Sequence, residues 1–135
     1  MNPLQSLLGR YDRLVILDTE TTGLSASRDE IIEFAAAVVE NREGQAAVTA
    51  QYDQLVALSP GGFVPARIEA LTGISTRDLR ERGLPKTRIC RDIGEFFQGN
   101  ALLLAYNAHF DLTFLYYLLL RSGDTAILRG KDKLD

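Results

Sequence analysis

The chain is poor in several residue types, and each shortage excludes a class of function. Its 135 residues include one cysteine, Cys90, and one histidine, His109. A single cysteine can form neither an intramolecular disulfide nor a zinc site built from several thiolates. Proteins that depend on disulfides belong to oxidising compartments, so we expect a soluble protein of the cytoplasm.

An excess of positive charge is also missing. The chain has 15 lysines and arginines against 18 aspartates and glutamates, which gives a net charge of −3 and a pI of about 5.2. Modules that bind nucleic acid through its phosphates usually carry a strong positive excess. The composition therefore counts against a simple nucleic-acid-binding module. It does not count against an enzyme that holds a nucleic acid through metal ions bound by acidic residues.

Long apolar runs are absent as well. No run reaches the roughly 20 residues that cross a membrane as a helix, and the first 13 residues are too polar for a secretory signal. We therefore expect no membrane partner. Hydrophobic residues make up 46% of the chain, which is enough for one packed core, so residues 1–135 are predicted to form a single domain.

The order of predicted elements indicates an α/β fold. Two further strands follow a short apolar strand and form a meander with it, with Gly44 at the turn between them; the alanines at 35–37 also suit the start of a helix. Gly23 can adopt a positive φ in the turn-rich segment 21–30. Another parallel strand is needed after the last helix, and only its first residues precede Asp135. The predicted strands are 14–17, 31–40, 46–58 and 101–107, and the predicted helices are 65–73, 75–83, 87–99 and 110–123.

Two acids end the first apolar strand, in the stretch RLVILDTETTGL at 13–24. Side chains alternate along a strand, so Asp18 and Glu20 share one face while Thr19 points to the other. Neighbouring carboxylates raise each other's pKa unless a cation lies between them, and Mg²⁺ and Mn²⁺ prefer such oxygen ligands. Taken alone, the pattern is also explained by two solvated acids at the end of a strand.

A third acid, Asp111, lies in the stretch YNAHFDLTFL at 106–115, in the first turn of the last helix. A carboxylate is favourable there because it faces the positive end of the helix dipole, which by itself explains the residue. Functional sites in α/β sheets gather at the carboxyl ends of strands. If strands 14–17 and 101–107 are neighbours, the three acids meet at one edge of the sheet, as two-metal cleavage of a phosphodiester requires.

Four segments together resemble a known family. VILDTETTGL, IIEFAAAVV, IEALTGIS and AYNAHFDLTFL, in this order and spacing, resemble the DEDD-type 3′–5′ exonucleases. This superfamily includes the proofreading exonuclease of bacterial replicative DNA polymerases. The resemblance covers residues 13–135. It implies a ribonuclease H-like fold, with a three-strand antiparallel meander followed by parallel strands and helices, and metal-dependent removal of nucleotides from DNA 3′ ends.

The resemblance also implies roles for individual residues and for partners. The implied cofactor is Mg²⁺ or Mn²⁺, and the implied substrate is a single-stranded or frayed 3′ end of DNA, or of RNA in an RNA-processing member, with a DNA polymerase as a further partner. Glu33 matches a recurring acid of the second strand, although a polar residue on a half-exposed strand explains it equally well. The implied catalytic and metal-binding residues are Asp18, Glu20 and Asp111, and the implied substrate-binding residues are Thr21, Thr22, Gly23, Leu24, Asn107 and Phe110.

The family's third motif, H-x-x-x-x-D, is not found in the sequence. His109 is followed five positions later by Phe114, and it lies inside the second motif, so we expect it to be a helix-entry residue. The closing KDKLD resembles the start of the strand that precedes the third motif. We therefore expect the domain to stop before that motif and to be weak or inactive in isolation. A catalytically dead partner-binding module is the alternative, but retention of all three acids favours an enzyme.

Overall fold

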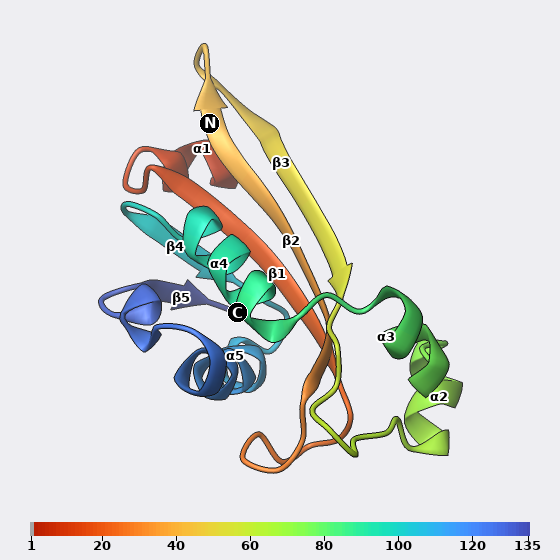
Figure 1. Cartoon of the computed structure of the whole chain (residues 1–135). Helices are drawn as coiled ribbons and strands as arrows, with labels where there is room; N and C mark the ends of the chain where they lie inside the picture. Colours follow the sequence, from red (N-terminus) through yellow and green to blue (C-terminus); the bar gives the residue numbers. More distant parts are fainter. Residues whose placement is uncertain (1) are drawn as a thin grey trace.

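The computed structural model describes residues 2–135 as a five-stranded sheet flanked by helices (Figure 1). The mixed α/β order predicted from the sequence is confirmed. No helix within these residues has the length and apolar character needed to cross a membrane. The elements are α1 (Pro3–Leu8), β1 (Arg13–Thr21), β2 (Ile31–Arg42), β3 (Gln45–Leu55), α2 (Ala66–Thr72), α3 (Thr76–Arg82), α4 (Lys86–Phe96), β4 (Ala101–Leu104), α5 (Ala108–Ser122), a 3-10 helix η1 (Thr125–Leu128) and β5 (Asp132–Leu134).

The strands lie in the order β3-β2-β1-β4-β5. β1 to β3 form an antiparallel meander, and β4 and β5 add to it in parallel, as predicted. Residues 35–37 lie inside β2, so the helical alternative for them is wrong: hydrogen bonds to strands on both sides override the helix preference of alanine. Glu43 and Gly44 both have positive φ, as a tight hairpin turn requires.

Several element boundaries differ from the sequence prediction. β4 ends at Leu104 rather than at 107, because residues 105–107 form the turn into α5, which begins at Ala108. α1 was not predicted, because its apolar residues are few; it is fixed by Pro3 in its first turn and by Asn2, which accepts a hydrogen bond from the Gln5 backbone. β5 adds three residues in parallel beside β4.

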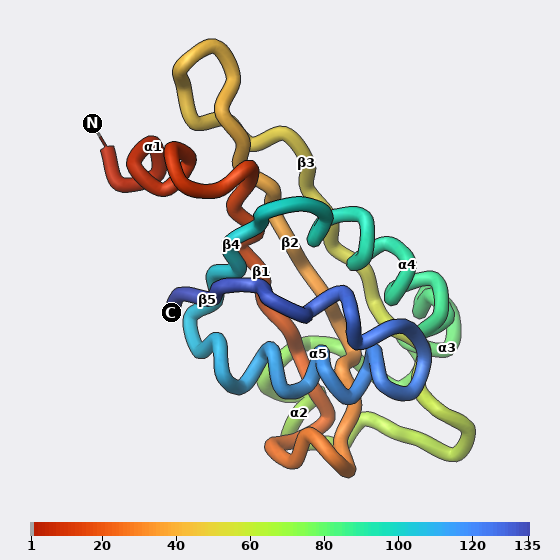
Figure 2. The backbone as a smooth tube through the Cα atoms, turned by 90° about the vertical axis from the view of Figure 1, so that its left-hand side faces the viewer, coloured from red at the N-terminus to blue at the C-terminus, as the bar shows by residue number. Residues whose placement is uncertain are grey.

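One face of the sheet packs against α4 and α5, which lie on the same side of β1 and β2 (Figure 2). Val15, Leu17 and Thr19 point to this covered face and are buried. The main core combines the two apolar residues with apolar residues of both helices. The alternation along β1 thus places every second side chain on the core side, which fixes the strand's register.

Helix α1 covers one end of the opposite face of the sheet. There, α1 packs with Leu7 and Leu8 against Leu14 and its neighbours on β2 and β4. Further along β1 the cover stops: Ile16 is 42% exposed and Asp18 is exposed. The half of this face that carries the acids of β1 is therefore open.

A half-buried ion pair ties the start of β2 to the start of α4. Lys86 Nζ lies 2.7 Å from Glu30 Oε1 and also donates to the Ala57 carbonyl. Ser59 donates to the same Glu30 oxygen through its backbone N–H and its hydroxyl, each at 2.9 Å. Burial raises the pKa of Glu30, but the hydrogen bonds from Lys86 and Ser59 outweigh it and hold the pKa below its usual value.

Candidate active site

The pairing of β1 with β4 brings the two acidic motifs together. The parallel ladder ends where Ile16 pairs with Leu104, and the chain then turns into α5. The edge of β1 beyond Ile16 is left free of a strand, and the first turn of α5 occupies this place. There the Thr19 hydroxyl donates a 2.5 Å hydrogen bond to Asp111 Oδ1. The expected neighbourhood of strands 14–17 and 101–107 is confirmed.

Thr19 has a part that sequence reasoning missed. It points away from Asp18 and Glu20, as predicted, but its hydroxyl faces the core side, where it is the side-chain partner of Asp111. Thr19 is 7% exposed and Asp111 is 5% exposed. Buried polar groups are almost always hydrogen-bonded, so a threonine on the inward face of β1 was a signal that a polar partner lay opposite.

Replacing Thr19 with valine is expected to lower the free energy of unfolding by about 1–3 kcal/mol, because the buried Asp111 carboxyl loses its side-chain donor. The measurement is urea denaturation at pH 7, with Thr19→Ser as the matched control, since serine keeps the hydroxyl. Equal stability of the valine variant and the parent would contradict a stabilising role for this bond.

Asp18 and Glu20 extend from the open face of β1. Among residues 2–135, neither takes part in an ion pair. Burial, followed by the nearby charges of Asp18 and Asp111, raises the pKa of Glu20. Burial, together with the charge of Asp18, also raises the pKa of Asp111 against the opposing bond from Thr19. The three acids therefore repel one another, and no basic side chain offsets that repulsion within the described residues.

These acids fit a hard divalent cation by the chemistry of their donors. Carboxylate oxygens are the ligands that Mg²⁺ and Mn²⁺ prefer, and such an ion would remove the repulsion. Within residues 2–135, however, no three acidic, histidine or cysteine side chains converge into a group that could hold a metal ion. Thr19 holds Asp111 on the helix side of β1, Asp18 and Glu20 extend from the open face, and the three acids are near enough for their charges to act on one another.

A band of further acids continues across the open face. Glu33 lies directly opposite Glu20 in the β1–β2 ladder. Burial, a hydrogen bond with Asp53 and the charges of Asp53, Glu20 and Asp18 raise the pKa of Glu33 to about 7. Glu33 is thus a half-buried strand residue with other acids on both sides. Asp53 was missed, because its proximity depends on the pairing of β3, which no local pattern shows.

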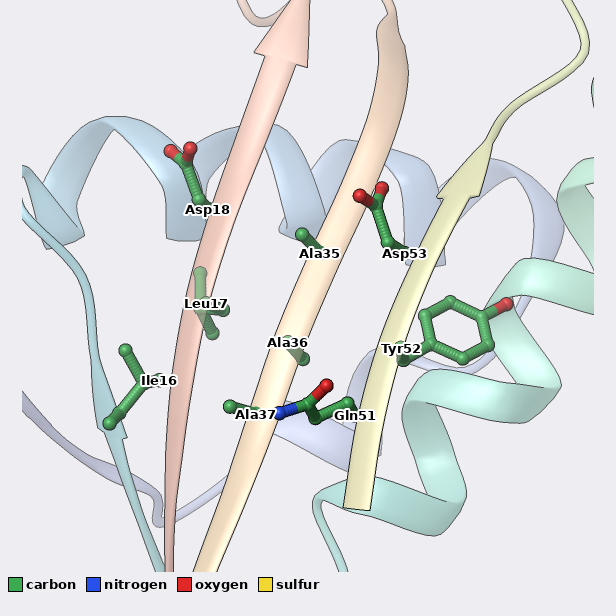
Figure 3. Close-up of a pocket in the computed structure, with 9 residues that line it drawn as sticks. All are labelled: Ile16, Leu17, Asp18, Ala35, Ala36, Ala37, Gln51, Tyr52 and Asp53. Atoms are coloured by element: carbon green, nitrogen blue, oxygen red, sulfur yellow. The ribbon is translucent and has the colours of Figure 1, made fainter. Parts of the chain in front are cut away.

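Figure 3 shows a shallow hollow on this open face, with the helices behind the sheet. Its volume is about 420 Å³. Asp18 on β1 and Asp53 on β3 stand on either side of Ala35, as the strand register requires. Ala35 and Ala37 of β2 have small side chains and do not cover the carboxylates of Asp18 and Asp53, which are accessible to solvent.

The segment after β1 forms a tight loop. Thr21, Thr22 and Gly23 are buried, whereas Leu24 is 81% exposed. The Thr21 hydroxyl donates to the Gly23 carbonyl at 2.7 Å. Gly23 does not use the positive φ that the sequence suggested. Its glycine is required by space instead, because a Cβ atom there would collide with the carboxylate of Asp29.

The other predicted substrate-binding residues lie around the start of α5. Asn107 is exposed and its carbonyl accepts the backbone N–H of Asp111. Phe110 is half-buried and packs on Phe114, with ring centroids 4.8 Å apart. His109 is exposed in the first turn of the helix, as expected for a helix-entry residue.

Comparison with known proteins places these features in context. The model of the RNase_T exonuclease family matches residues 15–132. A 3′-5′ exonuclease DinG of Bacillus subtilis is 38% identical over 112 residues, which are 82% of this chain and 11% of that protein. A PolC-type DNA polymerase III of Streptococcus sanguinis is 31% identical over 115 residues, or 85% of this chain and 7% of the polymerase. The chain thus spans only a small part of the length of these relatives.

Solved structures agree in fold. Exonuclease I of E. coli in complex with a dT13 oligonucleotide superimposes with a TM-score of 0.79 at 18% identity, covering 92% of this chain and 28% of that one. A product-bound exonuclease I gives the same TM-score and identity. The predicted ribonuclease H-like fold is thereby confirmed.

Proposed function

This chain belongs to the RNase_T exonucleases, within the DEDD exonuclease superfamily, and we propose that it removes nucleotides from the 3′ ends of single-stranded or frayed DNA with divalent metal ions. The family is one of 3′–5′ exonucleases. The DNA substrate, the metal dependence and the role of each residue are the proposal. DNA is favoured because the relatives include DinG, PolC-type polymerases and an exonuclease I bound to a DNA oligonucleotide.

The single observation that carries the proposal is the hydrogen bond between Thr19 and Asp111. It joins the strand that bears Asp18 and Glu20 to the helix that bears Asp111, across 92 positions of the sequence. Two motifs that are ordinary when taken alone therefore become one acidic site. Solvation at a strand end can explain Asp18 and Glu20, and the helix dipole can explain Asp111. Neither explains why three carboxylates without a neutralising cation lie near one another at one end of the sheet.

In this proposal, Asp18, Glu20 and Asp111 would hold Mg²⁺ or Mn²⁺. When bound, such ions activate a water molecule and offset the charge that develops on the phosphate. Thr19 holds Asp111 at the edge of β1. Thr21, Thr22, Gly23 and Leu24 receive the terminal nucleotide, with Asn107 and Phe110 shaping the opposite side of the site.

A general base and a further acid are not supplied by residues 1–135, in which no H-x-x-x-x-D motif occurs. A positioned general base typically contributes a factor of about 10²–10⁴ in rate. We therefore infer that residues 1–135 alone release nucleotides slowly. Release of nucleotides by residues 1–135 is therefore measured over long incubations at high protein concentration.

The direct test is a 5′-labelled single-stranded DNA incubated with Mg²⁺ or with chelator. We expect a ladder that shortens one nucleotide at a time from the 3′ end and that is absent in chelator. The same oligonucleotide as RNA separates DNA from RNA as the preferred substrate. Products that shorten from the 5′ end, or no shortening in any metal, would contradict the proposal.

Metal binding is expected to be visible without catalysis. Mn²⁺ at 100 times its dissociation constant should stabilise the fold by about 2.7 kcal/mol, because a ligand that binds only the folded state shifts unfolding by mass action. The measurement is the melting temperature with and without Mn²⁺ in the parent and in Asp111→Asn. A partner-binding module without a metal site predicts that Mn²⁺ leaves the melting temperature of both proteins unchanged.

A further inference from the structure

The loop between β1 and β2, residues 22–30, is held together by the carboxylate of Asp29. Asp29 Oδ1 accepts a hydrogen bond from the Thr22 hydroxyl at 3.2 Å, and Asp29 Oδ2 accepts the backbone N–H of Ser25 at 2.9 Å. The backbone N–H of Asp29 in turn donates to the Ser25 carbonyl at 2.6 Å. Asp29 therefore ties together residues on both sides of Leu24.

The partners of Asp29 are themselves fixed. The Thr22 hydroxyl also accepts the Glu30 backbone N–H at 3.0 Å, and the Thr22 backbone N–H donates to the Glu30 carbonyl at 2.9 Å. Gly23 packs directly on the Asp29 carboxylate, where no Cβ atom fits. The loop is thus a packed turn in which the Asp29 side chain fills the centre.

The outer side of the loop is anchored by the rest of the fold. Arg121, near the end of α5, donates to the Ser27 carbonyl at 2.7 Å. Glu30, at the base of the loop, is held by Lys86 and Ser59. The loop, which follows β1 directly at the bottom of Figure 1, is therefore attached both to α5 and to the start of α4.

The fixed loop leaves the apolar side chain of Leu24 exposed to solvent. Leu24 is 81% exposed although Thr22 and Gly23 beside it are buried. Exposure of one leucine is ordinary, but here the turn that exposes it is fixed by hydrogen bonds on both sides. It lies four residues after Glu20, at the end of the sheet where the acids gather. An apolar side chain in that place can pack on the face of a nucleobase.

We propose that Asp29 is a positioning residue that presents Leu24 to the terminal base of the substrate by fixing residues 22–25. The inference rests on the proposed exonuclease function and assigns Asp29 a part in substrate affinity rather than in the chemical step. The side chain of Asp29 does not contact the substrate; it acts through Thr22, Ser25 and Gly23.

The first measurement reports on the loop without any activity. The chain contains no tryptophan, so the tryptophan introduced by Leu24→Trp is a unique fluorescent probe. Its time-resolved anisotropy should decay mainly with overall tumbling in that single variant. Adding Asp29→Ala should produce a large fast component in the anisotropy decay, because the loop is released. The control is Asp124→Ala, which removes a similar turn-capping carboxylate after α5 and should add no fast component. An unchanged decay with Asp29→Ala overturns the proposal.

The second measurement uses steady-state release of nucleotides by the whole protein with Leu24 intact. Asp29→Ala is expected to raise KM about tenfold and to change kcat less than twofold. The KM of Asp29→Asn should stay within about twofold of the parental KM. The asparagine amide oxygen can still accept the Ser25 backbone N–H, and its NH₂ group can donate to the Thr22 hydroxyl. A loss of kcat with unchanged KM in Asp29→Ala overturns the assignment to substrate affinity.

A third variant tests the mechanism through Gly23. Gly23→Ala forces the Asp29 carboxylate aside, so it should raise KM like Asp29→Ala, and the double variant should be no worse than either single one. Fully additive effects would contradict a shared mechanism. If the parent protein releases no nucleotides at all, the proposed function fails, while the anisotropy result still decides whether Asp29 holds the loop.

Discussion

Replacing Asp18 with asparagine is expected to lower kcat for release of 3′ nucleotides by about a thousandfold. A bound metal ion supplies several kcal/mol of transition-state stabilisation, and each 1.36 kcal/mol is about a factor of ten in rate. The asparagine would keep the size of the side chain but lose the charge that holds the ion. Rates are measured with a labelled oligonucleotide in saturating Mg²⁺, on the protein as its host makes it.

The same substitution is not expected to destabilise the fold. Asp18 is exposed and has no ion pair within residues 2–135, and its charge repels Glu20 and Asp111. Its removal should leave the melting temperature in chelator unchanged or higher. Glu43→Gln, which removes one charge at the tip of the β2–β3 hairpin, is the control and should keep parental activity. Parental activity in Asp18→Asn would refute a metal-binding role for this residue.

Lys86→Met is expected to cost about 2–3 kcal/mol of unfolding free energy at pH 7. The substitution leaves the Glu30 carboxylate half-buried without its cation and also removes the donor to Ala57. Breaking a fully buried pair costs about 3–5 kcal/mol, and the smaller figure reflects the partial solvent contact of both side chains. Urea denaturation of parent and variant gives the difference directly.

The pH dependence of this loss identifies its cause. The pKa of Glu30 is lowered in the folded state, so its contribution to stability is present above the unfolded pKa of about 4.3 and is lost as the pH falls through the folded value. The gap between parent and Lys86→Met should therefore shrink between about pH 5 and pH 3. Adding Glu30→Gln to Lys86→Met should recover part of the stability at pH 7. A gap that is constant over this range would show that packing, not charge, is responsible.

Local patterns were sufficient to predict the elements that carry the site. The apolar run before Asp18 predicts a buried strand, the turn formers after Glu20 predict a loop, and the spacing of apolar residues around Asp111 predicts a helix. These features depend on residues close in sequence. The resemblance to the DEDD exonucleases then added their relative arrangement, and the pairing of β1 with β4 agrees with it.

Contacts that depend on the three-dimensional path of the chain were beyond such patterns. That Thr19 binds Asp111, that Asp53 approaches Glu33, and that Gly23 packs on Asp29 all depend on register and on turns that sequence spacing leaves undetermined. β4 was predicted too long for a related reason: residues 105–107 continue the strand pattern without a break, but the chain must turn there to begin α5. In each case the local sequence allowed more than one conformation, and a contact in the folded structure selected one of them.

The distance in sequence between Thr19 and Asp111 has a consequence for biosynthesis. The two residues are 92 positions apart, which a ribosome covers in roughly 5–20 s at about 5–20 residues per second. Throughout that interval the nascent chain carries Asp18 and Glu20 without Asp111. The proposed site thus cannot assemble on the ribosome until α5 has been made and has docked on β1. The order of synthesis itself therefore delays the appearance of the proposed nuclease site.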